Sequence, residues 1–188
     1  MSIAITLPLT KAQTAALHAG DIVAISGTLY TARDAAHKRM LEDYEKTGRF
    51  PFDMENATIY YTGPAPAKPG QVIGPIGPTT SYRMDAYAPF LLDHGETGMI
   101  GKGKRSEAVV EAMKRNTAVY FAATGGAAAL LQSHILSSEI IAYEDLGAEA
   151  IRRLEVRDLP AIVVIDSQGN DLYATEKAKY RQKDVLGE

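Results

Sequence analysis

The sequence of 188 residues contains no cysteine, and this absence excludes several kinds of chemistry. The chain can form no disulfide and offers no thiol nucleophile, and it has no thiolates of its own to hold an iron–sulfur cluster. Histidine is scarce, and its four occurrences show none of the close spacing typical of zinc ligands, so we expect no metal site formed by this chain alone. The histidines are His18, His37, His94 and His134.

Long apolar runs and an excess of basic charge are also missing. No run of about 18 apolar residues occurs, so we expect no membrane-spanning helix. The first residues, Met-Ser-Ile-Ala-Ile-Thr-Leu-Pro, lack the basic start and apolar core of a signal peptide, so we expect a cytoplasmic protein. The 20 basic and 23 acidic residues give a net charge of −3, which argues against a nucleic-acid partner.

What the chain does contain is typical of one globular domain. Its hydrophobic fraction is 46%, and 188 residues favour a single domain over residues 1–188. Residues 63–70, Gly-Pro-Ala-Pro-Ala-Lys-Pro-Gly, resemble a linker in composition. The segment is short and strands are predicted on both sides, so we expect an internal loop. We expect residues 176–188 to form a polar tail.

Predicted strands and helices alternate along the chain, which indicates an α/β domain with a mixed or parallel sheet. The predicted strands are residues 2–7, 21–28, 57–62, 99–100, 119–122, 139–143, 161–166 and 171–174. The predicted helices are residues 11–18, 32–47, 84–94, 107–115, 127–134, 148–154 and 176–183.

The stretch Gly-Pro-Thr-Thr-Ser-Tyr-Arg at residues 77–83 is the strongest candidate for a functional site. Thr79, Thr80 and Ser81 precede a predicted helix, whose N-terminus would present free N–H groups and a positive dipole. Hydroxyls, N–H groups and the guanidinium of Arg83 together suit an anionic ligand. A turn with a helix cap and a solvated arginine explains the same composition equally well.

Two further loops carry cations. Arg33 lies in the first turn of a predicted helix, where a cation opposes the dipole and is best explained by an anionic partner, although an ordinary exposed arginine is the simpler interpretation. Lys102 lies in a basic, glycine-rich loop that follows a predicted strand. This loop is not a nucleotide-hydrolysing phosphate loop, because Arg105 occupies the position that needs Ser or Thr. A solvated basic loop is as plausible as an anion site.

Arg33, Arg83 and Lys102 together could neutralise a small dianion. Thr79, Thr80 or Ser81 could supply an acid, a base or an orienting hydroxyl. A threonine hydroxyl is a weak base, so another group would have to activate the substrate, most simply a metal Lewis acid.

Three motifs occur in order along the chain: Gly27-Thr28-Leu29-x-x-Ala32-Arg33-Asp34-x-x-His37, Gly77-Pro78-Thr79-Thr80-Ser81-x-Arg83-Met84 and Gly101-Lys102-Gly103. In this combination the sequence resembles the iron–sulfur hydro-lyases, specifically the β subunit or C-terminal domain of class I fumarases and L-tartrate dehydratases. The resemblance extends from the first predicted strand to residues 161–173. It implies a swivelling β/β/α domain, with a mixed, largely parallel sheet flanked by helices.

The resemblance also implies roles for individual residues. Thr79 would be the base that takes a proton from the carbon next to a carboxylate. Arg33, Arg83 and Lys102 would bind the substrate carboxylates.

Four other motif residues would assist these groups. The resemblance implies that groups around Thr80 and Ser81 help to bind substrate. We assign Asp34 and His37 to the orientation of Arg33.

The implied cofactor is a [4Fe–4S] cluster on three cysteines of a partner α subunit, with one iron open to the substrate. The absence of cysteine here agrees with that division of labour. We expect this domain to form a homodimer within a heterotetramer that acts on a small dicarboxylate.

The expected reaction is the reversible hydration of fumarate to L-malate. Alanine at position 32 is more typical of fumarases than of tartrate dehydratases, which tend to carry cysteine at that position. The alternatives are the β subunit of an L-tartrate dehydratase, which yields oxaloacetate, and a non-catalytic module that binds small anions.

Overall fold

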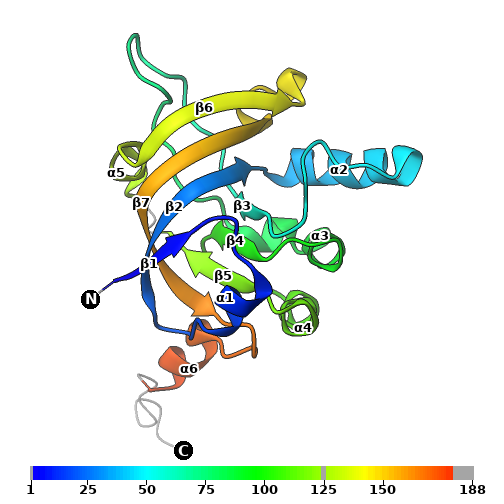
Figure 1. Cartoon of the computed structure of the whole chain (residues 1–188), viewed down its shortest axis with the longest axis vertical. Coiled ribbons are helices and arrows are strands. Elements are labelled where there is room, and N and C mark those ends of the chain that lie inside the picture. The colour runs from blue at the N-terminus through cyan, green and yellow to red at the C-terminus, as the bar shows by residue number, and fades with distance from the viewer. Residues whose placement is uncertain (1, 124–125, 180–188) are drawn as a thin grey trace, which may run out of the picture.

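A mixed sheet of seven strands forms the centre of the computed structural model, which describes residues 2–123 and 126–179 (Figure 1). The strands are β1 (Ile3–Thr6), β2 (Ile22–Thr31), β3 (Thr58–Tyr60), β4 (Gly98–Gly101), β5 (Val119–Ala122), β6 (Ile135–Ala142) and β7 (Ile151–Ile165). The helices are α1 (Lys11–Ala15), α2 (Asp34–Thr47), α3 (Ala88–Asp93), α4 (Glu107–Asn116), α5 (Ala128–Gln132) and α6 (Leu172–Lys179), with 3₁₀ turns η1 (Ser81–Met84) and η2 (Glu144–Glu149). None of the helices in the described residues is both long and apolar enough to cross a membrane.

Strand β7 closes the sheet on itself. It pairs antiparallel with β2, β5 and β6, while β2, β3, β4 and β5 form a parallel series. The five strands β2, β3, β4, β5 and β7 therefore form a closed ring, and β1 joins β2 in parallel at the outside. Among the described residues four strand pairings are parallel and three are antiparallel. The sheet is mixed and flanked by helices as predicted, but its antiparallel share is larger than predicted.

The prediction of a helix over residues 148–154 is wrong, because most of that segment belongs to β7. Ile151 and Leu154 are three residues apart, which fits a helix, but both are buried in a strand that bonds β2 on one edge and β6 on the other. Pairing on both edges outweighs the local apolar spacing.

The predicted strand over residues 171–174 is also wrong: Asp171 forms only an isolated bridge to Ile165, and α6 begins at the next residue. Predicted helix residues 180–183 lie outside the described residues.

The prediction of one helix over residues 84–94 is wrong as well. The structure has the 3₁₀ turn η1 and then the separate helix α3, which carries Pro89 in its first turn. Proline lacks the N–H that a helix interior needs, but it fits the first turn of a helix. The segment Thr79–Ser81 therefore leads into a 3₁₀ turn and not into the N-terminus of an α-helix.

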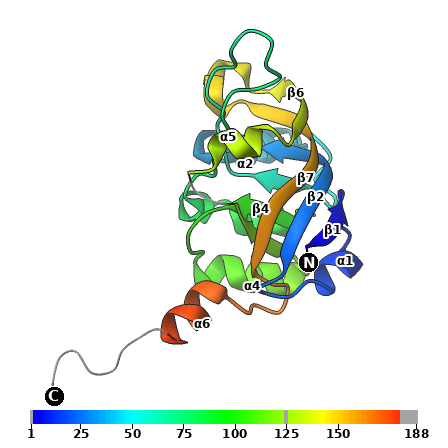
Figure 2. The same cartoon turned by 90° about the vertical axis from the view of Figure 1, so that its left-hand side faces the viewer.

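Strands β3, β4 and β5 are buried on both faces. In β5, Val119 and Phe121 belong to the core inside the closed sheet, whereas Tyr120 belongs to a second core beneath α2, α3 and α4. These three helices lie on one side of the sheet (Figure 1), and Figure 2 shows α6 projecting from the body of the molecule. Burial on both faces explains why these strands are continuously apolar in sequence.

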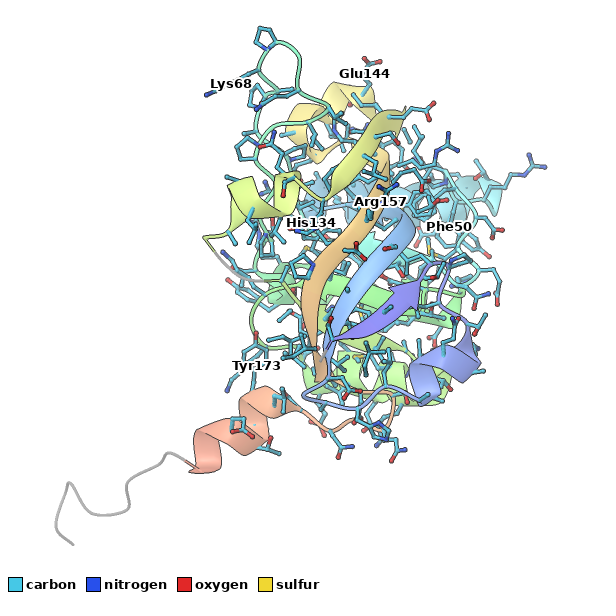
Figure 3. The ribbon with its side chains drawn as sticks, turned by 60° about the vertical axis from the view of Figure 1, so that its left-hand side comes forward. Phe50, Lys68, His134, Glu144, Arg157 and Tyr173 are labelled. Atoms are coloured by element: carbon cyan, nitrogen blue, oxygen red, sulfur yellow. The ribbon has the colours of Figure 1, made fainter. Side chains whose placement is uncertain are left out.

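Residues 63–70 form a loop at one end of the molecule. Lys68 of this loop and Glu144 of η2 lie at that same end (Figure 3). The two segments are in contact, because a Cβ atom added at Gly63 would lie 2.8 Å from the carbonyl oxygen of Ala148.

The core beneath the helices encloses a carboxyl group. Glu96 is fully buried, and neither of its carboxyl oxygens has a hydrogen-bond partner in the described residues. Burial raises the pKa of Glu96 to about 8, although the charge of Arg105 acts in the opposite direction. The side chain is therefore mostly protonated at neutral pH in the folded state.

We expect this buried acid to make stability fall as the pH rises. Between about pH 4.5 and 8 the unfolded chain has lost the Glu96 proton that the folded chain still holds, so folding weakens by up to about 1.4 kcal/mol per pH unit. Glu96→Gln keeps the shape without the titration. The free energy of unfolding of the variant minus that of the wild type, measured in urea, should grow across this range and level off outside it. A difference that stays constant would mean that Glu96 is ionised in the folded protein.

Candidate functional site

Three neighbouring parallel strands end at one edge of the sheet, where two of the predicted site residues and a glycine follow them. Arg33 follows β2, Gly63 follows β3 and Lys102 follows β4. Ligand sites in parallel sheets form at this edge, because the chain leaves each strand there in loops that are free to vary.

The segment that contains Thr79 crosses this edge. Pro78 forms an antiparallel bridge with Thr62, the Thr79 N–H donates to the Tyr61 carbonyl at 2.6 Å, and Thr80 pairs in parallel with Lys102. Backbone pairing on both sides therefore fixes Thr79 and Thr80 between the ends of β3 and β4. The predicted base and the predicted Lys102 thus lie on adjacent segments.

Asp34 links the two arginines of the site. Its Oδ2 accepts a hydrogen bond from Arg83 Nη2 at 2.7 Å, and its Oδ1 lies 3.7 Å from Arg33 Nε. Arg33 also pairs with Glu149 of η2 at 3.3 Å. Each of these side chains is partly exposed, so the pairs are screened by water and contribute modestly to stability. Their main consequence is that Arg33 and Arg83 are held side by side.

The space for Arg33 depends on a glycine. A Cβ atom at Gly63 would lie 2.8 Å from the Ala148 carbonyl oxygen and 3.2 Å from Arg33 Cδ. Any larger residue at this position would push Arg33 away from η2. Gly63 is not part of the motifs in the sequence, so its role is evident only in the structure.

Thr79, Thr80 and Lys102 provide the groups that are available to a ligand. The two threonines are half-buried and Lys102 is exposed. Within residues 2–123 and 126–179 their hydroxyl and amino groups have no hydrogen-bond or ion-pair partner. The three cations of the site outnumber Asp34 and Glu149, which favours an anion.

Ser81 differs from its two neighbours, because its side chain is fully buried. Its hydroxyl lies 2.8 Å from the Tyr120 hydroxyl and accepts a hydrogen bond from the Lys102 N–H at 3.1 Å. The Ser81 N–H donates to the Lys102 carbonyl at 2.8 Å. These bonds join Ser81 to the backbone of Lys102 and to Tyr120, and the role of Ser81 in substrate binding stays a prediction.

His37 is buried against the ring of Tyr61, with 5.2 Å between the ring centroids. Its Nδ1–H donates to the backbone carbonyl of Arg33 at 2.9 Å, since a carbonyl can only accept. Burial lowers the pKa of His37 to about 4, outweighing the opposite effect of that hydrogen bond, so the ring is neutral at neutral pH. His37 therefore contacts the backbone of Arg33, whereas Asp34 contacts the guanidinium.

A different hollow, of about 440 Å³, lies over β2, β6 and β7. Among the described residues, its lining includes the carboxylates of Asp53, Glu55, Glu139 and Glu155 but only one guanidinium, that of Arg153. Such a surface repels a dicarboxylate. The cationic edge of the sheet is therefore the better candidate site for an anion.

The described side chains offer no ligand set for a metal. Within residues 2–123 and 126–179 no group of three or more His, Asp or Glu side chains is arranged to hold an ion, and the sequence supplies no cysteine. An iron–sulfur cluster does not fit the residues of this chain.

Sequence reasoning missed Glu149 and three residues behind the site, which are the buried Arg105 and Tyr120 and the half-buried Asp85. The sequence shows Arg105 only as a mismatch to a phosphate loop. Lys102, Lys104 and Arg105 lie in the same short basic segment, so the local sequence does not indicate that Arg105 alone is buried.

Comparison with known proteins supports the sequence motifs. The family model of the fumarase C-terminus matches residues 1–176. The chain is 39% identical over 157 residues to fumarate hydratase 2 of Leishmania major, covering 82% of this chain and 28% of that protein. It is 39% identical over 153 residues to the aerobic class I fumarate hydratase of Escherichia coli (strain K12), covering 80% and 28%.

A third relative matches over nearly its whole length. The chain is 36% identical over 181 residues to a putative L(+)-tartrate dehydratase subunit beta of Methanocaldococcus jannaschii, covering 93% of both chains. The chain thus spans 28% of each of the two fumarate hydratases, whereas it is similar in length to this separate subunit.

Proposed function

This chain belongs to the fumarase C-terminus family, and from that membership we propose that it is the β subunit of a two-subunit fumarate hydratase, a hydro-lyase that reversibly adds water to fumarate to give L-malate. The observation that carries the proposal is the meeting of Thr79 with Arg33, Arg83 and Lys102 at one edge of the sheet. A dicarboxylate has two charges for these cations to bind, and a carbon next to a carboxylate for Thr79 to reach.

In this proposal the cations hold and orient the substrate. Arg33 and Arg83 bind carboxylates through their planar forks, and Lys102 contributes a point charge. Groups of Thr80 assist, and Asp34 keeps the two arginines adjacent. Binding at both ends fixes the carbon chain relative to Thr79, which lowers the entropic part of the activation barrier.

Thr79 transfers the proton. During dehydration of malate, deprotonated Thr79 Oγ1 takes a proton from the carbon next to one carboxylate, the electron pair forms the double bond, and hydroxide leaves the adjacent carbon. The proton on Thr79 and this hydroxide then leave together as water, which restores the deprotonated oxygen. During hydration, water supplies a hydroxide that adds to one carbon and a proton that Thr79 Oγ1 delivers to the other. A neutral threonine is a weak base, so this step requires the deprotonated hydroxyl. We propose that the nearby cations stabilise its negative charge.

The proposal requires a partner. We propose that a cysteine-bearing α subunit holds a [4Fe–4S] cluster, which would supply Lewis acidity toward the hydroxyl and carboxylate of the substrate. The longer relatives leave room for that part, since this chain covers 28% of their length. We further propose that the domain swivels relative to the α subunit, that two copies pair within a cytoplasmic heterotetramer, and that residues 1–188 act as one domain.

L-tartrate dehydratase is the second candidate, and the similarity in length to the Methanocaldococcus jannaschii subunit favours it. The same residues would serve an elimination on tartrate. Anaerobic co-expression with the candidate α subunit, followed by rates on fumarate, L-malate and L-tartrate, separates the two. Turnover of fumarate and malate that neither chain gives alone supports the first candidate, and preference for tartrate supports the second. A complex with an intact cluster and no turnover contradicts both.

Arg83→Lys is expected to weaken the complex with the dicarboxylate. Lysine keeps the charge but loses the planar fork, and it cannot reproduce the 2.7 Å contact with Asp34 in the same geometry. Loss of a charged hydrogen bond of about 1.5–3 kcal/mol corresponds to a rise in KM of about 10–100-fold. Steady-state kinetics of the assembled enzyme measure this. Arg153→Lys, at an exposed ion pair with Glu139, is the matched control, and equal kinetics of the two variants would contradict a binding role for Arg83.

A further inference from the structure

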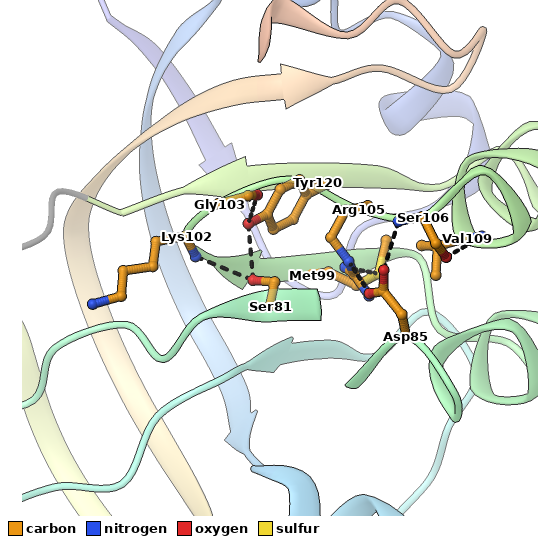
Figure 4. Close-up of polar contacts among 9 residues, drawn as sticks. All are labelled: Ser81, Asp85, Met99, Lys102, Gly103, Arg105, Ser106, Val109 and Tyr120. Carbon is orange, nitrogen blue, oxygen red and sulfur yellow. Dashed lines mark hydrogen bonds and ion pairs between the residues drawn. The ribbon is translucent and has the colours of Figure 1, made fainter. Parts of the chain in front are cut away.

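An ion pair between the buried Arg105 and the half-buried Asp85 lies directly behind the candidate site. Arg105 Nε donates to Asp85 Oδ1 at 2.7 Å, and the other Asp85 oxygen accepts from the Ser106 N–H at 2.5 Å (Figure 4). Asp85 is the residue that ends η1, and Arg105 ends the loop that begins after β4. The pair therefore ties the end of the turn that contains Arg83 to the loop that contains Lys102.

Arg105 is unusual because its side chain has no exposed surface. Its guanidinium carbon lies 5.2 Å from the centroid of the Tyr61 ring and 5.1 Å from that of Tyr120. Burial acts to lower the pKa of Arg105, but the attraction of Tyr61 and Asp85 raises it, so the charge is permanent. A buried charge is costly unless it is paired, and here the ion pair and the two rings compensate for the lost water.

A chain of hydrogen bonds ties the other end of η1 to the same loop. The Lys102 N–H donates to Ser81 Oγ at 3.1 Å, and the Tyr120 hydroxyl donates to the Gly103 carbonyl at 2.9 Å. Since the Tyr120 proton is used on Gly103, the Ser81 hydroxyl must donate to the Tyr120 oxygen, at 2.8 Å. This chain of hydrogen bonds begins at Lys102 and ends at Gly103, both in the loop. Figure 4 shows the Lys102 side chain pointing away from these hydrogen bonds.

We propose that Arg105 and Tyr120 are positioning residues, which hold the loop with Lys102 at a fixed distance from η1, which contains Arg83, and from Thr79 just before it. Neither residue needs to touch the substrate, because their hydrogen bonds end on Asp85, Met99, Ser81 and Gly103. The proposal rests on the proposed function for its kinetic consequence. The mechanical link between loop and turn is independent of any activity.

Two variants test the link. Tyr120→Phe removes one hydroxyl and breaks the hydrogen-bond chain in its middle, and Arg105→Gln removes the charge that binds Asp85. Arg115→Gln is the matched control, because Arg115 bonds Asp93 through two nitrogens on the exposed side of α3 and α4. If Arg105→Gln fails to fold, Tyr120→Phe carries the test alone.

The first readout needs no activity. In the full chain, amide hydrogen exchange of Ser81 and Lys102 should become at least about tenfold faster in Tyr120→Phe and Arg105→Gln, and should be unchanged in Arg115→Gln. Unchanged exchange in the first two variants overturns the proposal. This result stands even if the assembled enzyme has no hydro-lyase activity, in which case the proposed function fails and the link does not.

The second readout separates positioning from mere stability. In the complex with the α subunit, well below the melting temperature, kcat per folded site should fall about 10–100-fold in Tyr120→Phe and Arg105→Gln, because small displacements of catalytic groups are costly. A purely structural role would reduce the amount of folded protein and leave kcat per folded site unchanged. That outcome, in an active wild-type complex, would overturn the positioning role.

Discussion

Thr79→Ala is expected to lower kcat of the assembled enzyme about 10²–10⁴-fold, which is the usual contribution of a positioned acid–base group. The substitution should leave the fold intact. The Thr79 backbone N–H makes the 2.6 Å hydrogen bond to Tyr61, and that bond is retained in alanine. The half-buried hydroxyl has no hydrogen-bond partner in the part of the chain that the structure describes, so its removal leaves no group unsatisfied there.

Two further substitutions separate the chemistry of Thr79 from its shape. Thr79→Val keeps the volume but not the hydroxyl, so it should be as inactive as Thr79→Ala. Thr79→Ser keeps the hydroxyl and should therefore retain most of the wild-type rate. Single-turnover kinetics with L-malate, together with unfolding in urea, measure rate and stability on the same samples. Near-normal turnover of Thr79→Val would remove Thr79 from the proton transfer.

The sequence predicted the elements whose ends carry local signals. The α2 helix ends at Gly48, which adopts a left-handed conformation, and α4 begins after Ser106, whose hydroxyl accepts from the Val109 N–H. Strand β5 matches its predicted range of residues 119–122. Caps and continuous apolar runs act over a few residues, so they are visible in a window of sequence.

The failed helix prediction over residues 148–154 depends on partners far away in the chain. Strand β7 is stabilised by pairing with β2, more than a hundred residues earlier, and no local window contains that information. The same limit applies to the site. The motifs predicted Thr79, Arg33 and Lys102 as site residues, but they could not show that Ser81 of η1 is hydrogen-bonded to Tyr120 of β5.

Gly101→Ala is expected to disturb the site through steric overlap alone. Gly101 ends β4 directly before Lys102, and a Cβ atom there would lie 2.0 Å from Ser81 Oγ. Such an overlap forces Ser81 or the backbone to move, which typically costs about 1–3 kcal/mol of folding free energy in a packed core. The movement also displaces Lys102, so the assembled enzyme should lose activity as well as stability. Urea unfolding and steady-state kinetics measure the two effects.

Ser81→Ala provides the test of this explanation. Without the Ser81 hydroxyl, the nearest atoms to a Cβ at Gly101 would be Tyr61 Cδ2 at 3.2 Å and the Cβ of residue 81 at 3.3 Å, distances that small shifts can accommodate. Gly101→Ala should therefore cost less in the Ser81→Ala background than in the wild type, with a coupling energy within the range of about 0.5–3 kcal/mol found for residues in contact. Additive effects would show that the two residues do not meet in the folded protein, and the close contact between β4 and η1 would then not be what fixes Lys102.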